Sequence, residues 1–329
     1  MPTNPSLTRR SFTASLTAVA SLGFGRTARA ADYPSRPVHF LVPYAAGGGT
    51  DLITRALTDI VARDWKSSVV IENRPGGGTT IASMVALSAP ADGYTLLAVS
   101  NGFLISPMMM PTPPYVWNRD FTGISLFAVS PHILVVHPSV PAKNFAEFVT
   151  WAKAEKDKAT YASFGNGASN QIGFEMLKHK LGIDTTHVPY KGIAPALNDL
   201  IAGHVKCMLG DLQNVSEQIK AGTLRALAVA NEKRLPSMPD VPSMKELGYD
   251  AIFYIWSGLF APAATPQPVM AALRDAVKRT VEDAEFKEAM NKVETPIAYL
   301  DAPAFKAFVD RDAERLKVAV ERIGKVPEK

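Results

Sequence analysis

Short apolar runs alternate with amphipathic stretches along most of the chain. Runs of β-branched and other apolar residues predict strands at 38–43, 69–72, 95–99, 124–129, 133–136, 160–162, 187–188 and 205–209. Helical periodicity predicts helices at 51–63, 80–88, 145–154, 169–180 and 194–202, and through most of 266–324 with breaks near 283 and 296. Strands that alternate with helices of about ten to fifteen residues indicate βαβ units and largely parallel sheets. The sequence therefore predicts an α/β fold.

The chain is long enough for more than one hydrophobic core. It has 329 residues, of which 47% are hydrophobic and 20% are charged. A stretch of α/β pattern this long exceeds one compact domain, so we expect two. The boundaries are expected within 125–130 and 249–256, and no flexible linker is evident in the composition.

The N-terminus has the order of an export signal. Arg9 and Arg10 precede Phe12, an apolar stretch follows at 14–24, and the segment ends in Ala28-Arg29-Ala30. This order predicts a signal peptide of the twin-arginine type, cleaved after Ala30, and a mature protein in the periplasm. The alternative is an amphipathic helix of the mature fold. No later stretch has about 18 uninterrupted apolar residues, so no membrane span is predicted.

Most of the basic character of the chain lies in this leader. The formal net charge is +4, and residues 1–30 hold four arginines with no Lys, Asp or Glu. The remaining chain has no net charge, which excludes nucleic-acid binding through bulk charge. The single cysteine, Cys207, cannot form an intrachain disulfide, and its strand-like surroundings predict a buried side chain.

A glycine-rich loop at 42–51 leads from a predicted strand into a predicted helix. Leu52 stands where a dinucleotide-binding fingerprint needs its third glycine, and the loop has no lysine for a phosphate-binding P-loop. Backbone N–H groups at a helix N-terminus would still favour an anion. The alternative is a tight turn in which Thr50 or Asp51 caps the helix.

A second loop of this kind lies at 162–170. It offers hydroxyl groups from Ser163 and Ser169 and an amide from Asn166, all of which can bind a carboxylate. The alternative is an N-cap at Ser169. A matched pair of loops suggests a ligand held between two lobes. A third glycine run, Gly76-Gly77-Gly78, follows Arg74-Pro75 and is interpreted as a plain turn.

Signals for catalysis or metal binding are weak. The sequence has no Gly-x-Ser-x-Gly nucleophile motif. The histidines lack metal-ligand spacing, and the pair His204 and Cys207 has no second pair to complete a zinc site. Met108-Met109-Met110 is interpreted as adaptable packing at an irregular surface, and the alternative is that it lines an apolar mouth. We therefore expect no metal, no cofactor and no enzymatic activity.

Segments distributed over nearly the whole mature chain carry a family resemblance. They are Tyr33-Pro34-Ser35-Arg36-Pro37, the run at 42–51, Val70-Ile71-Glu72-Asn73-Arg74-Pro75-Gly76, the run at 91–97, Val188-Pro189-Tyr190-Lys191-Gly192, the run at 221–229, Pro239-Asp240-Val241-Pro242 and Gly258-Leu259-Phe260-Ala261-Pro262. In this order they resemble the periplasmic solute-binding proteins of tripartite tricarboxylate transporters, the Bug proteins.

The resemblance implies a two-lobed, type II-like periplasmic binding fold that closes on a small carboxylate. It implies one domain from 31–128 with 254–329 and another at 129–253. By position, it implies ligand contacts from Tyr44, Gly47, Gly48, Thr50, Asp51, Ser100 and Asn101 in the first lobe. In the second lobe it implies contacts from Ser163, Gly165, Asn166, Ala168, Ser169, Asn170, Tyr190, Lys191, Gly192 and Asp211. The chain has Gly49 where most relatives carry serine.

These features together predict a monomeric solute-binding protein that captures a mono-, di- or tricarboxylate. Its partners would be the organic acid and membrane permease subunits, with no nucleic acid. One alternative is a periplasmic sensor that passes a signal to a membrane receptor. Another is a hydrolase that uses Ser163 or Ser169, for which the sequence identifies no base. With the first loop as a binding element, Gly48→Asp is expected to abolish binding.

Overall fold

The computed structural model describes residues 33–249 and 253–323. Its strands are β1 (Val38–Val42), β2 (Val69–Asn73), β3 (Thr95–Val99), β4 (Phe121–Val136), β5 (Thr160–Ser163), β6 (Thr186–Pro189), β7 (Cys207–Asp211), β8 (Arg225–Val229), β9 (Tyr254–Pro262) and β10 (Ile297–Leu300). Its helices are α1 (Gly49–Trp65), α2 (Thr80–Ser88), α3 (Gly102–Met109), α4 (Trp117–Asp120), α5 (Phe145–Glu155), α6 (Ser169–Leu181), α7 (Ile193–Ile201), α8 (Leu212–Lys220), α9 (Gln267–Glu282), α10 (Ala284–Lys292) and α11 (Ala302–Ile323). Short 3₁₀ turns lie at Gly77–Thr79 and Lys156–Lys158. The predicted signal peptide lies outside the described residues.

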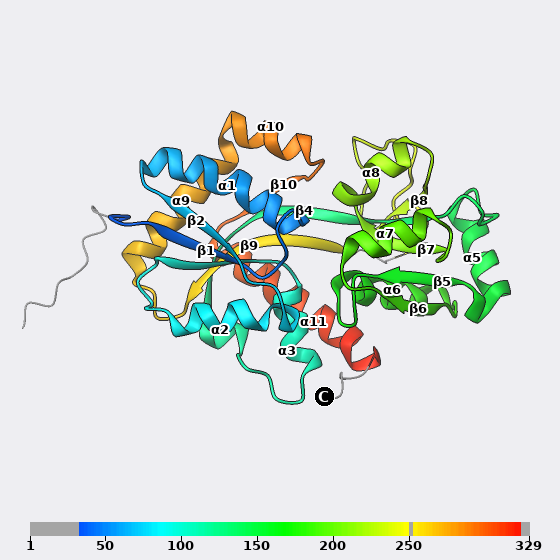
Figure 1. The fold of residues 1–329 in the computed structure, drawn as a ribbon, viewed down its shortest axis with the longest axis horizontal. Helices are drawn as coiled ribbons and strands as arrows, with labels where there is room; N and C mark the ends of the chain where they lie inside the picture. The colour runs from blue at the N-terminus through cyan, green and yellow to red at the C-terminus, as the bar shows by residue number, and fades with distance from the viewer. Residues whose placement is uncertain (1–32, 250–252, 324–329) are drawn as a thin grey trace, which may run out of the picture.

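The strands form one mixed sheet that passes through two lobes (Figure 1). Neighbouring strands follow the order β2-β1-β3-β9-β4-β7-β5-β6, and β8 and β10 also pair with β4. We call the part built on β1, β2, β3, β9 and β10 the first lobe, and the part built on β5 to β8 the second lobe. Residues 121–131 of β4 pair with β9, whereas residues 132–136 pair with β7 and β8. β4 therefore belongs to both lobes. One of the predicted domain boundaries falls within β4, and the boundaries stay a prediction.

Strand directions differ from the predicted largely parallel arrangement. β1 pairs in parallel with β2 and β3, and β5 pairs in parallel with β6 and β7. At the centre of the sheet, β4 and β9 run antiparallel to each other and to their other neighbours. The prediction was wrong there, because it extended the local βαβ pattern to strands that cross between the lobes.

β4 is one continuous strand where the pattern predicted two. Pro131 interrupts the apolar pattern and lacks a backbone N–H, which normally argues against a central strand. In the structure it lies opposite Tyr254, at the point where the pairing of β4 passes from β9 to β7. A residue without an N–H is tolerated where the ladder changes partners.

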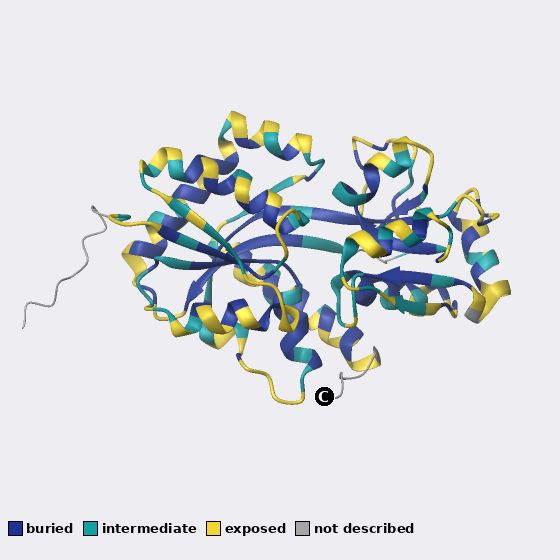
Figure 2. Cartoon of the chain, in the orientation of Figure 1, coloured by how far each residue is buried: buried dark blue, intermediate teal, exposed yellow. Residues whose placement is uncertain are grey.

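Helices cover both faces of the first lobe and bury its sheet (Figure 2). On one face, α1, α9 and α10 enclose a core that includes Phe40 and Phe286. On the other face, a core that includes Phe103, Trp256 and Phe305 continues into the second lobe. The indole Nε1 of Trp256 donates a hydrogen bond of 2.8 Å to Asp312 of α11. α11 also contacts α3 and α6, so this one helix supports both lobes (Figure 1).

Some elements lie outside the predicted pattern, namely α3, α4, α8, β8, β9 and β10. The prediction of a buried Cys207 is confirmed, and burial raises the pKa of its thiol. Phe145 and Phe148 of α5 are buried, and Trp151 packs against the same cluster. In the described parts of the chain, no helix combines the length and apolar character that a membrane span needs.

Candidate functional site

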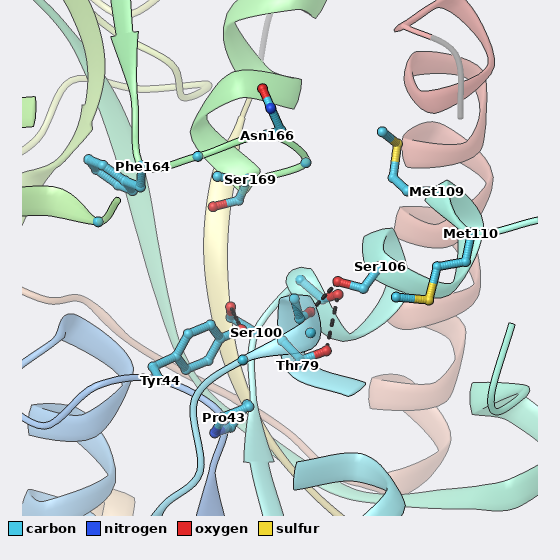
Figure 3. Close-up of a pocket in the computed structure, with 18 of the residues that line it drawn as sticks. Pro43, Tyr44, Thr79, Ser100, Ser106, Met109, Met110, Phe164, Asn166 and Ser169 are labelled. Carbon is cyan, nitrogen blue, oxygen red and sulfur yellow. Dashed lines mark hydrogen bonds between the residues drawn. The ribbon is translucent and has the colours of Figure 1, made fainter. Parts of the chain in front are cut away.

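A cavity of about 610 Å³ lies where the two lobes face each other (Figure 3). The first lobe contributes residues 43–44, 76–79 and 109–112 together with Ser100, Gly102 and Ser106. The second lobe contributes residues 164–169 and Gly192. Loops at the carboxyl ends of β1, β2, β3 and β5 therefore form most of the lining, which is the usual place for a ligand in open α/β sheets.

Hydroxyl groups on the first-lobe side are held in a fixed arrangement. The phenol oxygen of Tyr44 lies 2.6 Å from Oγ of Ser100. Burial raises the pKa of Tyr44 to about 12, although its hydrogen bond with Ser100 acts in the opposite direction. Tyr44 is therefore protonated near neutral pH, and its hydroxyl can donate a hydrogen bond. Ser106 donates from Oγ to the carbonyl of Gly78, so α3 supports the neighbouring loop.

The turn before α2 forms part of the cavity wall. Gly76, Gly77, Gly78 and Thr79 all have positive φ angles, of 118°, 57°, 63° and 101°. A threonine rarely adopts this conformation, and such strain is found preferentially at binding sites. The interpretation as a turn describes the backbone correctly, but it missed that these residues face the cavity. The unusual run of three glycines was the available signal.

The second glycine-rich loop lines the cavity over most of its length. Gly165 and Gly167 have φ angles of 140° and 77°, which side-chain-bearing residues rarely adopt. Oδ1 of Asn170 accepts a hydrogen bond from the N–H of Phe164 at 3.2 Å and so closes the loop from within. α6 begins directly after the loop with no side-chain cap and no acidic residue in its first turn. The N–H groups and dipole of α6 therefore provide an uncompensated positive end beside the cavity.

A chain of hydrogen bonds behind this loop keeps its shape. The N–H of Gly167 donates to Oε1 of Gln171 at 2.6 Å, so the amide nitrogen of Gln171 faces Nδ1 of His187, 3.2 Å away. The amide nitrogen can only donate, which leaves the ring proton on Nε2 of His187. This Nε2 lies 2.5 Å from Oγ of Ser163, and Ser163 in turn donates to the carbonyl of Gly165 at 3.0 Å.

This network bears on the alternative of a hydrolase site at Ser163. Sequence reasoning found no base, whereas the structure brings His187 to Ser163. The tautomer described above makes His187 a donor to Ser163 rather than an acceptor of its proton, so the contact positions the loop. Burial lowers the pKa of His187, while the Glu175 carboxylate acts in the opposite direction. The imidazole is thus favoured in its neutral form.

The first glycine-rich loop is arranged differently. Asp51 is fully buried, and its Oδ2 accepts hydrogen bonds from the N–H of Gly47 at 2.8 Å and from Arg55 at 2.9 Å. Its Oδ1 accepts from Asn73 at 2.8 Å. Burial acts to raise the pKa of Asp51, but these hydrogen bonds outweigh it and hold the pKa below its usual range. Asp51 therefore supports the loop from inside, with both carboxylate oxygens engaged.

A side chain of the second lobe covers the start of α1. A Cβ added at Gly49 would collide with Nε2 of Gln213, which projects from α8. Oε1 of Gln213 accepts a hydrogen bond of 2.9 Å from Oγ of Ser130, at the crossing point of β4. The absence of a side chain at Gly49 thus allows Gln213 to approach. No feature of the local sequence around Gln213 indicated this contact.

The structure brings only part of the predicted set of site residues to the cavity. Those that line it are Tyr44, Ser100, Gly165, Asn166, Ala168, Ser169 and Gly192. Those that do not are Gly47, Gly48, Thr50, Asp51, Asn101, Ser163, Asn170, Tyr190, Lys191 and Asp211. The cavity also includes residues that sequence reasoning did not select, namely Pro43, Gly76, Gly77, Gly78, Thr79, Gly102, Ser106, Met109, Met110, Pro111, Thr112, Phe164 and Gly167.

Several of the predicted contacts have other partners in the structure. Asn101 donates to the carbonyl of Tyr254 at 2.7 Å. Tyr190 donates from its hydroxyl to Asp199 at 2.7 Å, and Lys191 is exposed. Asp211 is buried, with Oδ1 2.9 Å from Nε2 of His132. Among the described residues, no group of three or more His, Cys, Asp or Glu side chains is arranged to hold a metal ion.

Comparisons with known proteins agree with the two-lobed form. A family model described as the tripartite tricarboxylate transporter family receptor matches residues 53–325. A UPF0065 protein of Bordetella pertussis is 34% identical over 87% of this chain and 87% of its own length. Protein BugT of the same organism is 30% identical over 82% of this chain and 84% of its own length.

Solved structures with the same two-lobed periplasmic binding fold superpose over most of the chain. Periplasmic binding protein BugD has 33% identity and a TM-score of 0.79, covering 88% of this chain and 98% of its own. Rpa4515 of R. palustris, solved with adipate, has 27% identity and a TM-score of 0.81 at 88% and 98% coverage. MatC from Rhodopseudomonas palustris, solved with malate, has 28% identity and a TM-score of 0.77 at 87% and 99% coverage.

Proposed function

Because this chain belongs to the tripartite tricarboxylate transporter receptor family, we propose that it is a periplasmic solute-binding protein that captures a small carboxylate between its lobes and delivers it to a membrane permease. The observation that carries the proposal is the uncapped N-terminus of α6 at the interlobe cavity. An anion there gains from the helix dipole and from open N–H groups.

Two further observations support the proposal. The hydroxyl of Ser169 and the amide of Asn166 lie on the same side of the cavity as the start of α6 (Figure 3), and both can donate hydrogen bonds to a carboxylate. The structural relatives solved with adipate and with malate show that proteins with this fold bind organic acids. We propose that Ala168, Ser169, Gly165 and Asn166 bind the carboxylate, and that Tyr44 and Ser100 face it from the first lobe.

The proposal is tested with acids and their uncharged counterparts. Calorimetry on protein purified from the periplasm should detect hexanoate or adipate binding and no binding of hexanamide, which has nearly the same shape as hexanoate without the charge. Binding of the amide as strongly as the acids, or binding of sugars and amines instead of acids, would contradict the proposal.

Export and delivery are separate parts of the proposal with their own tests. The leader at residues 1–30 supports export, and intact-mass analysis of the periplasmic protein should give a chain that begins at Ala31. For delivery, cells that lack this protein should lose uptake of the acid it binds, and the plasmid-borne gene should restore it. Unchanged uptake in such cells would favour a sensor role.

A further inference from the structure

One side of the cavity is formed by large apolar side chains. Met109 is the last residue of α3, and Met110 and Pro111 follow it along the cavity. We call these three residues the apolar wall. A Cβ placed on Gly167 would lie 3.9 Å from Cγ of Met109, so the end of α3 reaches the second-lobe loop. Figure 3 shows both methionine side chains on the α3 side of the cavity.

The remaining lining combines glycines and small apolar residues with neutral polar side chains. Among the described residues that line the cavity, none is Arg, Lys, His, Asp or Glu. Several first-lobe hydroxyls already have partners: Tyr44 with Ser100, and Ser106 with the Gly78 carbonyl. Lys191, the basic residue next to this lining in sequence, is exposed. A bound anion therefore depends on the helix terminus and on neutral donors rather than on a cationic side chain.

We propose that the ligand is an organic acid with a single carboxylate and an apolar body, either aryl or alkyl. The proposal rests on the proposed function, because it assumes that the carboxylate lies at the start of α6. The body then packs on the apolar wall, where unbranched methionine side chains adapt to its shape. A second carboxylate in that position would lose its hydration beside methionine and proline without a cation in exchange, which is unfavourable.

The size of the cavity is consistent with this class of ligand. Its volume of about 610 Å³ lies within the range of about 300–1,000 Å³ that holds small organic ligands. Burial of an apolar body on the wall would supply affinity that a lone carboxylate cannot supply. The acid bound here would therefore differ from the dicarboxylates in the structures solved with adipate and malate.

Pairs of acids that differ by one carboxylate test the proposal. Hexanoate and adipate both have six carbons, and benzoate and terephthalate share one ring. Calorimetry on the wild-type protein should give at least about tenfold tighter binding for the monoacid of each pair. If adipate and terephthalate bind more tightly, the proposal is overturned while the proposed function stands. If no acid of either kind binds, the proposed function fails first.

A charge placed on the wall provides a second test. Met110→Arg supplies a cation for a distal carboxylate, so we expect the preference to reverse, with adipate gaining and hexanoate losing about tenfold. Met84→Arg is the matched control, because Met84 is exposed on α2 and does not line the cavity. It should leave both affinities unchanged. If Met110→Arg folds and alters neither affinity, the wall does not contact the ligand and the proposal is wrong.

Discussion

The two glycine-rich loops look alike in sequence and differ in the structure. Each leads from a strand into a long helix, and each contains glycine with a positive φ, at Gly47 and at Gly165 and Gly167. At the start of α1, however, the Asp51 carboxylate compensates the helix dipole and Gln213 covers Gly49. At the start of α6 there is neither an acidic residue nor a side-chain cap. A glycine pattern indicates where backbone N–H donors can be exposed. The surrounding side chains decide whether these donors are available to a ligand.

The largest expected effect comes from placing a negative charge in each of the two loops and comparing how strongly acid binding is weakened. Ser169→Asp places a carboxylate at the start of α6, beside the proposed anion site, and should weaken acid binding by about 100-fold or more. Gly48→Asp places the same group at the N-cap of α1, where φ is −73° and aspartate is a favoured residue, with the added Cβ 3.2 Å from the carbonyl oxygen of Ala45. Because Gly48 does not line the cavity, we now expect its effect on affinity to be below about threefold. Calorimetry on both variants checks this.

The opposite outcome of that experiment is equally informative. If Gly48→Asp abolishes binding and Ser169→Asp does not, the ligand contacts the first loop, as the sequence alone suggested. Circular dichroism spectra that match the wild type are required for both variants, so that a loss of affinity reports on the site rather than on folding.

A smaller effect is expected from the contact that covers α1. Gly49→Ser introduces a side chain where Gln213 lies, so Gln213 must move and lose its hydrogen bond with Ser130. We expect the free energy of unfolding to fall by about 1 kcal/mol, the usual net value of one hydrogen bond. Gln213→Ala should cost a similar amount, and the double variant should cost little more than either single one. If the losses of unfolding free energy, measured by urea unfolding, are strictly additive, the two residues are not coupled.

The smallest expected effect is a difference in pH dependence. Burial holds the pKa of His187 below its ordinary value, so the unfolded chain binds a proton at this position before the folded protein does. Neutral His187 contributes to the free energy of unfolding above about pH 6.5. This contribution is lost as the pH falls through the pKa of His187 in the folded protein. Asp51, whose pKa is also lowered, loses its contribution only at a more acidic pH. As the pH falls, the second loop should therefore lose the stabilisation from His187 before the first loop loses the stabilisation from Asp51.

The measurement compares wild type with His187→Gln, which keeps a neutral donor and acceptor. Between about pH 6.5 and 5, the unfolding free energy of the wild type should fall more steeply with acid than that of the variant. The two slopes should differ by less than about 1.4 kcal/mol per pH unit, which is the value for uptake of one full proton on unfolding. Solvent reaches part of the imidazole ring, and this reduces the shift of its pKa. Parallel curves would contradict the role of His187. Glu175 and Lys178 also act on His187 and are unchanged in the variant.

Local pattern predicted the α/β class, the buried Cys207 and the second loop, because each depends on residues close together in sequence. The family resemblance added the two-lobed form, which periodicity alone does not indicate. The antiparallel centre of the sheet was missed because the pairing of β4 with β9 joins residues more than a hundred positions apart.

The same limit applies to the candidate site. Met109 and Met110 follow no motif, and their position is set by the end of α3 against the second-lobe loop. Gln213 lies in an amphipathic helix in which a glutamine is unremarkable, and its role depends on a glycine in the other lobe. His187 meets Ser163 only because β5 and β6 are neighbours in the sheet. Such contacts depend on how distant elements pack.

β4 and β9 pair along the crossing between the lobes, with Val129 opposite Trp256 and Ser130 opposite Ile255. Two strands joined by a ladder form a ribbon, which twists about its length more easily than it bends within its plane. Rotation of one lobe about the ribbon would move Gln213 away from Gly49 while the ladder stays intact. The torsional stiffness of this ribbon would then limit how far the two faces of the interlobe cavity can separate.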